Sequence, residues 1–254
     1  MSIFHYNQKR IHYTEQGTGE PLLLLHGNAA SSNMFYGVAP KFATDYRVIL
    51  IDFLGHGASD RLAAFSADMW YYEAEQVIAF LREKKLERVN LIGTSGGANV
   101  AINVALEAPE LVNKVIADSL EGESLADEVV AYIREERSQN KKNKEASQFY
   151  YYMHGDDWES VVDNDTRALI AHGQQIKRFF HKALTDLETE ILLVGSKEDE
   201  FMAAVSSSDL EETYKKLFKK IKHGEIHLFQ TGGHPSLMTN LDQFVALSND
   251  FLRR

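Results

Sequence analysis

The pentapeptide Gly93-Thr94-Ser95-Gly96-Gly97 places a serine among glycines. It directly follows an apolar run at 89–92 and opens an alanine- and valine-rich stretch, which predicts a sharp turn from a buried strand into a helix. Small neighbours leave room for the strained backbone of such a turn, which lifts the hydroxyl above the sheet and directs the N–H of Gly96 toward an oxyanion. The G-x-S-x-G pattern is common by chance. Its strand and helix context favours Ser95 as a nucleophile over a solvent-facing serine in a glycine-rich turn.

A serine nucleophile needs a general base, and His234 has the most suitable position among the ten histidines. It lies in Thr231-Gly232-Gly233-His234-Pro235, just after the last predicted strand. Sites in parallel α/β sheets collect at the carboxyl ends of the strands, so the hydroxyl and the imidazole are expected to meet. Five other histidines lack such placement and are expected at the surface or in packing: His154, His172, His181, His223 and His227.

The base in turn needs an acid that orients its ring, and we expect this acid after another strand. The apolar run 191–194 leads into 195–200, which contains Asp199 and, next to it, the rival Glu198. We expect neither metal nor cofactor, because no HExxH pattern or phosphate loop is present. Asp156-Asp157 is interpreted as an acidic turn and not as a metal site.

The elements that must position these residues follow from the apolar pattern. Five runs lack polar alternation, which is typical of parallel strands covered on both faces: 22–25, 48–51, 89–92, 114–117 and 191–194. An N-terminal hairpin is expected over 3–7 and 10–15, and a last strand over 225–230.

A first helix is expected from Ser66 to Leu81, with Ser66 as its N-cap and with Phe65 and Trp70 as a hydrophobic staple. Three further helices are expected over 95–108, 208–221 and 236–252. The alternation predicts a three-layer αβα fold with a mostly parallel, eight-stranded sheet and helices on both faces. Residues 119–186 contain no such strand and are expected to form a helical cap, or lid, inserted into a core of 1–118 and 187–254. In it, the aromatic residues 149–152 and Trp158 are expected to form the cap's own core more than a pocket.

Composition excludes several classes of function. The 254 residues carry a formal charge of −10, which argues against nucleic-acid binding. There is no cysteine, so a disulfide framework, a thiolate metal site and a cysteine nucleophile are excluded. No secretory signal or apolar run long enough to span a membrane occurs, so a cytoplasmic protein is expected. The oligomeric state is not predicted.

These motifs resemble those of the α/β-hydrolase fold superfamily, nearly from end to end, and of its serine esterases in particular. The order Ser95, Asp199, His234 is the order that this superfamily uses. Residues 26–28, His-Gly-Asn, resemble its oxyanion loop, which implies that the backbone N–H of Asn28 is a second oxyanion donor beside Gly96. Residues 52–59, D-F-L-G-H-G-A-S, resemble a loop that is structural in relatives, so no catalytic role is carried over to them.

The segment that begins His26-Gly27-Asn28 also resembles haloalkane dehalogenases, in which the asparagine holds the halide. Those enzymes use an aspartate on the elbow, where this chain has Ser95, so dehalogenation and epoxide hydrolysis are not expected. The resemblance implies hydrolysis of a carboxylic ester of a small, partly apolar acyl substrate through an acyl-enzyme. A thioesterase, a C–C bond hydrolase, an acyltransferase, a perhydrolase and a ligand receptor on the same fold remain alternatives.

Overall fold

The structure is a computed structural model that describes residues 2–205 and 209–254. Its strands form one eight-stranded sheet in the order β1-β2-β4-β3-β5-β6-β7-β8, antiparallel at β1-β2 and β2-β4 and parallel elsewhere. The strands are β1 (Ser2–Tyr6), β2 (Lys9–Gln16), β3 (Glu20–Leu25), β4 (Tyr46–Ile51), β5 (Val89–Thr94), β6 (Val112–Asp118), β7 (Glu190–Ser196) and β8 (Gly224–Phe229).

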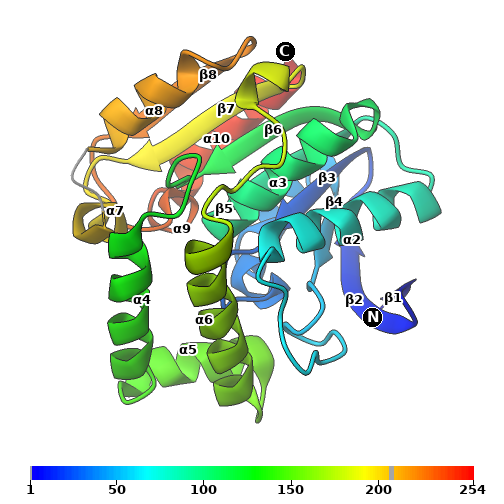
Figure 1. Cartoon of the computed structure of the whole chain (residues 1–254). Helices are drawn as coiled ribbons and strands as arrows, with labels where there is room; N and C mark the ends of the chain where they lie inside the picture. Colours follow the sequence, from blue (N-terminus) through cyan, green and yellow to red (C-terminus); the bar gives the residue numbers. More distant parts are fainter. Residues whose placement is uncertain (1, 206–208) are drawn as a thin grey trace.

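Both faces of the sheet are buried, which explains the uninterrupted apolar runs. In β3, Leu23 and Leu25 belong to one hydrophobic cluster while Leu22 and Leu24 belong to another on the opposite face. Helices α2 (Met69–Glu83) and α3 (Gly96–Glu107) cover the first face, and α10 (Leu241–Arg253) covers the second (Figure 1). The predicted three-layer α/β architecture is therefore confirmed.

The shorter elements complete the two layers. They are η1 (Ser32–Phe35), α1 (Ala39–Phe42), η2 (Pro109–Leu111), η3 (Leu184–Asp186), α7 (Glu200–Val205), α8 (Leu210–Phe218) and α9 (Ser236–Thr239). No helix of the described ranges is both long enough and apolar enough to cross a membrane.

Three predicted helix boundaries were wrong. The helix expected from Ser66 begins at Met69, because the Ser66 hydroxyl accepts the N–H of Asp68 in a turn that precedes it. The helix expected over 236–252 is divided at Asn240 into α9 and α10. The one expected over 208–221 ends already at Phe218; it begins at Leu210 with Asp209 as the N-cap, and Ser208 lies outside the described residues.

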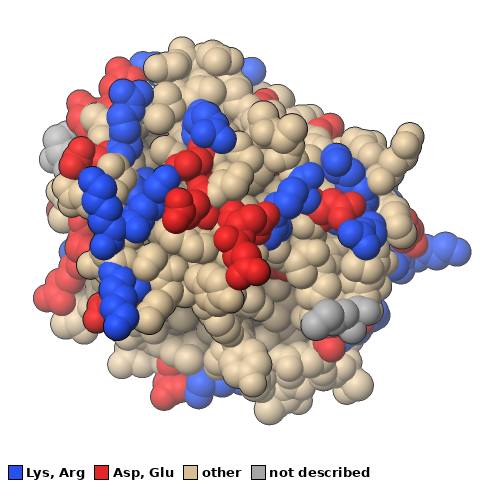
Figure 2. All heavy atoms as spheres, turned by 90° about the horizontal axis from the view of Figure 1, so that it is seen from below, with Lys and Arg blue, Asp and Glu red and all other residues tan. Residues whose placement is uncertain are grey.

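Three helices, α4 (Asp127–Asn140), α5 (Lys144–His154) and α6 (Trp158–Gln175), occupy the segment between β6 and β7 that was expected to be helical. In Figure 1, α4 and α6 run side by side below the sheet, and α5 crosses their far end. The basic run begins in the turn between α4 and α5, where Lys141 pairs with Asp163 at 2.7 Å. Figure 2 views the molecule from this end and shows basic and acidic side chains interspersed, so neither sign of charge covers the face alone.

Candidate active site

Ser95 lies on the turn between β5 and α3 with φ 54° and ψ −125°, a conformation that residues with a side chain rarely adopt. The turn is tight because backbone atoms lie directly against the two glycines that flank Ser95, at positions 93 and 97. A Cβ on Gly93 would collide with the carbonyl oxygen of Gly97, and a Cβ on Gly97 would collide with that of Leu25. Glycine at both positions is therefore a steric requirement of this elbow.

Replacing Gly93 by alanine is expected to destabilise the fold, because the new methyl group would meet backbone that cannot rotate away. The expected cost is about 1–3 kcal/mol, which lowers Tm by about 2–4 °C per kcal/mol in a domain of this size. Thermal unfolding measures it. The matched control is Gly37→Ala, where a Cβ would meet nothing within 4 Å. Equal Tm values for the two variants would contradict the steric argument.

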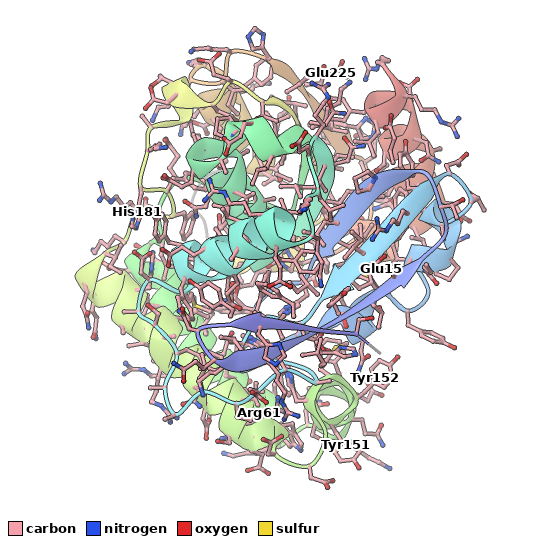
Figure 3. All side chains as sticks on the ribbon, turned by 90° about the vertical axis from the view of Figure 1, so that its right-hand side faces the viewer. Glu15, Arg61, Tyr151, Tyr152, His181 and Glu225 are labelled. Atoms are coloured by element: carbon pink, nitrogen blue, oxygen red, sulfur yellow. The ribbon has the colours of Figure 1, made fainter. Side chains whose placement is uncertain are left out.

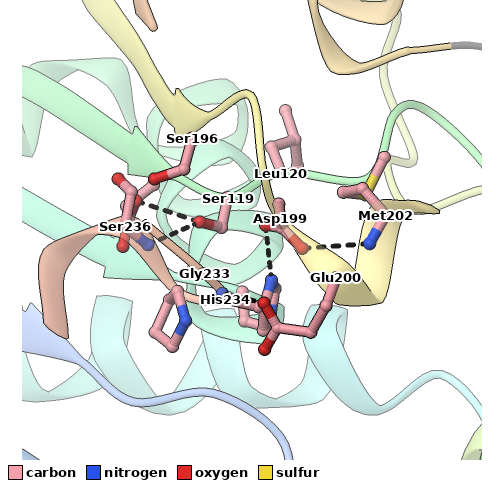
Figure 4. Close-up of polar contacts among 12 residues, drawn as sticks. Ser119, Leu120, Ser196, Asp199, Glu200, Met202, Gly233, His234 and Ser236 are labelled. Atoms are coloured by element: carbon pink, nitrogen blue, oxygen red, sulfur yellow. Dashed lines mark hydrogen bonds and ion pairs between the residues drawn. The ribbon is translucent and has the colours of Figure 1, made fainter. Parts of the chain in front are cut away.

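The structure brings Ser95, His234 and Asp199 into a hydrogen-bonded chain. His234 Nε2 lies 2.9 Å from Ser95 Oγ. On the other side of the ring, His234 Nδ1 lies 2.9 Å from Asp199 Oδ2, a contact that Figure 4 shows. Because a carboxylate only accepts hydrogen bonds, Nδ1 carries the ring proton and Nε2 is free to accept the serine O–H. Asp199 is 2% exposed and also accepts the N–H of Met202 at 2.9 Å, whereas Glu198 points to solvent.

The loop that carries His234 is fixed by two further carboxylates that sequence reasoning missed. Asp118, at the end of β6, accepts hydrogen bonds from Thr94 Oγ1 at 2.6 Å, from the N–H of Leu237 at 3.1 Å and from Ser236 Oγ. Glu200 Oε2 accepts the backbone N–H of His234 at 3.0 Å. The end of β6 and the start of α7 are thus tied to this loop, and Thr94 at the end of β5 is joined to it through Asp118.

Acidic neighbours also set the proton affinity of the imidazole. Burial alone would lower the pKa of His234, but the hydrogen bond and charge of Asp199, with the charges of Glu121 and Asp118, outweigh it and raise this pKa above 6.5. The cationic form of this imidazole is therefore stabilised in the site.

The rate of hydrolysis is expected to rise with pH along a limb centred above 6.5, because only the neutral form of His234 accepts a proton and its pKa is raised. The experiment is kcat/KM against pH between 5 and 9 at constant ionic strength. A limb centred at or below 6.5 would show that the acidic neighbours do not act on the base. Neutral surroundings would leave the pKa of His234, and therefore the centre of this limb, at about 6.5.

Glu121 is a further acidic side chain at the site, and it was not predicted. It lines the same cavity as Ser95 and His234, and burial raises its pKa to about 7. Its Oε2 atom is buried with no hydrogen-bond partner in the described part of the chain. The position of Glu121 could have indicated it, because Glu121 follows β6 just as Asp199 follows β7. However, residue 121 lies in the range 119–186 that is expected to form the cap.

Two backbone N–H groups in the loops next to Ser95 have no hydrogen-bond partner among the described residues. Within residues 2–205 and 209–254, the N–H groups of Asn28 and Gly96 donate no hydrogen bond. Their loops are in close contact, since a Cβ on Gly27 would lie 3.2 Å from that of Ser95. The Asn28 side chain is held by Trp70, whose Nε1–H donates to Asn28 Oδ1 at 3.1 Å.

A cavity of about 210 Å³ opens at Ser95. Most of its lining is apolar: Ala30, Met34, Trp70, Ile133, Phe149, Leu169, Phe201 and Pro235, with Glu121, Glu136 and Arg137 as its charged groups. The aromatic cluster divides between two roles. Tyr150 is buried and stacks on Trp158 with ring centroids 5.7 Å apart, Phe149 lines the cavity, and Tyr151 and Tyr152 are exposed on α5 (Figure 3).

The other histidines take packing or surface positions. His154 and His172 are buried, His181 stacks on Tyr71, and His223 is exposed. Asp157, in the acidic turn, binds Arg61 at 2.7 Å. No group of three potential metal ligands was found in the described ranges.

Comparison with known proteins identifies the family of the chain. A model of the alpha/beta hydrolase fold family matches residues 20–168, more than half of the chain. The chain is 25% identical to a 2-hydroxy-6-oxo-6-phenylhexa-2,4-dienoate hydrolase of Comamonas testosteroni, over 96% of this chain and 91% of that protein. Among solved structures, an alpha/beta hydrolase enzyme from a Medee basin deep-sea metagenome library superposes with a TM-score of 0.76 at 18% identity, over 100% of this chain and 98% of that one.

An esterase from Exiguobacterium antarcticum superposes with a TM-score of 0.74 at 19% identity, over 97% of this chain and 96% of that one. Structural similarity at these low identities shows the fold alone. The match of the family model over more than half of the chain shows the family. The chain belongs to the alpha/beta hydrolase fold family.

Proposed function

We propose that this protein is a serine hydrolase that cleaves a carboxylic ester of a small, partly apolar acyl substrate through an acyl-enzyme. The observation that supports this most strongly is the chain of two 2.9 Å contacts from Ser95 through His234 to Asp199. It combines a nucleophile, a base in reach of it and an acid that fixes the tautomer of the base.

In the first step, Ser95 Oγ attacks the acyl carbonyl carbon while His234 Nε2 takes the hydroxyl proton. The tetrahedral oxyanion is bound by the N–H groups of Gly96 and Asn28, each of which contributes about 3 kcal/mol in comparable sites. The imidazolium then gives its proton to the leaving alcohol, and the C–O bond to that alcohol breaks. Water, deprotonated by His234, attacks the acyl-enzyme and releases the acid and Ser95.

The helices between β6 and β7 would form the cap over this site, and the core would comprise residues 1–118 and 187–254. Ile133 of α4 and Leu169 of α6 line the cavity together with Trp70 from the core, which supports a role of the cap in binding the acyl chain. A cavity of about 210 Å³ suits a short acyl group.

A second candidate is hydrolysis of a C–C bond by the same residues. The identity to the Comamonas testosteroni enzyme over nearly the whole chain favours it. The substrate in the name of that enzyme is a dienol with a ketone at C6. Its keto tautomer is a vinylogous 1,5-diketone, in which a ketone takes the place of the ester carbonyl as the electrophile.

One panel of substrates separates these functions. Purified protein is assayed on p-nitrophenyl esters of increasing acyl length, on acyl thioesters and on vinylogous 1,5-diketones, with Ser95→Ala as the blank. The proposal predicts Ser95-dependent turnover that is fastest on short-chain esters. Faster turnover of the diketones would select the second candidate, and no turnover of any substrate would contradict both.

A further inference from the structure

The loop that carries Asn28 is held from outside the sheet by two side chains of the helical insertion. The N–H of Ala29 donates to Asp165 Oδ2 of α6 at 2.9 Å, and the carbonyl oxygen of Ala29 lies 3.0 Å from His154 Nε2 of α5. Ala29 itself is fully buried with φ 51°, a left-handed conformation that is unfavourable for alanine. Both polar groups of the residue after Asn28 are therefore bound by the insertion.

The acceptor in this clamp is an ionised carboxylate. Burial alone would raise the pKa of Asp165, but contact with His56, the charge of Arg137 and the N–H of Ala29 lower it below its ordinary value. His56 Nε2 lies 3.5 Å and Arg137 Nη2 lies 3.9 Å from this carboxylate, which is completely buried. A charged acceptor makes the hydrogen bond from Ala29 stronger than a neutral one would.

The donor in the clamp is a neutral histidine with a fixed tautomer. The N–H of Gly57 donates to His154 Nδ1 at 3.1 Å, so Nδ1 carries no proton and Nε2–H is left to donate to the carbonyl oxygen of Ala29. Burial, together with the charge of His56, lowers the pKa of His154 to about 4, which keeps the ring neutral near pH 7.

The end of α5 that carries His154 is itself fixed to the core. Ser31 Oγ donates to the carbonyl oxygen of Met153 at 2.9 Å, and Arg61 Nη2 donates to that of His154 at 2.8 Å. Figure 3 shows Arg61 beside this end of the insertion. Asn33 Nδ2 adds a hydrogen bond of 2.8 Å to the carbonyl oxygen of Tyr152. The insertion and the loop at 27–33 thus form one connected unit.

We propose that Asp165 and His154 are positioning residues, which hold Ala29 in its left-handed conformation and so keep the N–H of Asn28 directed at the oxyanion. The proposal rests on the proposed function and adds to it that the insertion controls the chemical step as well as the shape of the cavity. An oxyanion donor acts in the transition state, so loss of the clamp lowers kcat and leaves KM nearly unchanged.

The test compares three substitutions on the best ester of the panel. Asp165→Leu removes the acceptor at similar volume, and kcat is expected to fall about 10- to 100-fold, because a complete loss of one oxyanion donor costs about 100- to 1000-fold. Asp165→Asn, which retains an acceptor oxygen, is expected to recover most of kcat. Asp163→Leu, on the same helix but 45% exposed and paired with Lys141 instead of with Ala29, is the matched control and should stay within about twofold.

Several outcomes would overturn the proposal. They are a folded Asp165→Leu with unchanged kcat, a rise in KM at constant kcat, or equal losses in the leucine and asparagine variants. Should Asp165→Leu fail to fold, His154→Phe removes the other half of the clamp without leaving a buried charge unpaired, and the same loss of kcat is expected. Normal ester turnover by the wild type in any of these cases would leave the proposed function intact.

Discussion

Replacing Ser95 by alanine is expected to lower ester hydrolysis by about 10⁵- to 10⁶-fold and to leave the fold intact. The loss is large because the hydroxyl is the atom that forms the covalent bond, and no other group in the described ranges donates to His234 Nε2. The residual activity of the variant would come from the oxyanion donors and from substrate binding. The measurement is kcat/KM on the preferred ester. The protein concentration is determined by a method that does not depend on the active site.

The fold should tolerate this change because alanine removes one oxygen and no buried methyl group. The alanine variant is therefore expected to unfold within a degree or two of the wild-type Tm. If it hydrolyses the ester at more than about one hundredth of the wild-type rate, another group is the nucleophile.

Asp199→Asn is expected to lower kcat by about 10⁴-fold, the size of effect that a wrong tautomer produces in a serine–histidine–aspartate site. The carboxylate accepts the Nδ1 proton of His234 at 2.9 Å, whereas an amide can present an N–H there and direct the ring proton to Nε2. Nε2 then no longer accepts the serine proton. The measurement is kcat on the same ester, with circular dichroism to confirm the fold.

The neighbouring carboxylate provides the matched control for this prediction. Glu198→Gln also removes one negative charge from the same loop, but its side chain is exposed and makes no hydrogen bond to the imidazole. Its kcat is expected to stay within about twofold of the wild type. A larger loss in Glu198→Gln than in Asp199→Asn would reverse the assignment of the acid.

The five central strands, β3 to β7, could be predicted because each contains a short apolar run and is covered on both faces, a pattern that depends on local sequence alone. The elbow could be predicted for the same reason, since the residues that make it tight, Gly93 and Gly97, lie two positions from Ser95. The start of α2 could not, because Ser66 caps a turn and not the helix, and the two uses of a serine look alike in sequence.

The supports of the site were missed for a different physical reason, which is that they depend on contacts between remote segments. Ala29 and Asp165 are 136 positions apart, and Asp118 and Ser236 are 118 apart. Nothing in the local pattern around Asp165 distinguishes it from an exposed acid of an amphipathic helix. Its burial follows from how α6 packs against the loop at 27–31, which only the folded chain shows.

The central claim is that His234 activates Ser95 as a nucleophile. It is tested most directly by reaction with a fluorophosphonate followed by peptide mass spectrometry of the wild type and of His234→Ala. The account predicts one adduct, on Ser95, that forms rapidly in the wild type and is nearly absent from the histidine variant. An adduct on a different residue, or equal labelling of Ser95 in both proteins, would contradict it.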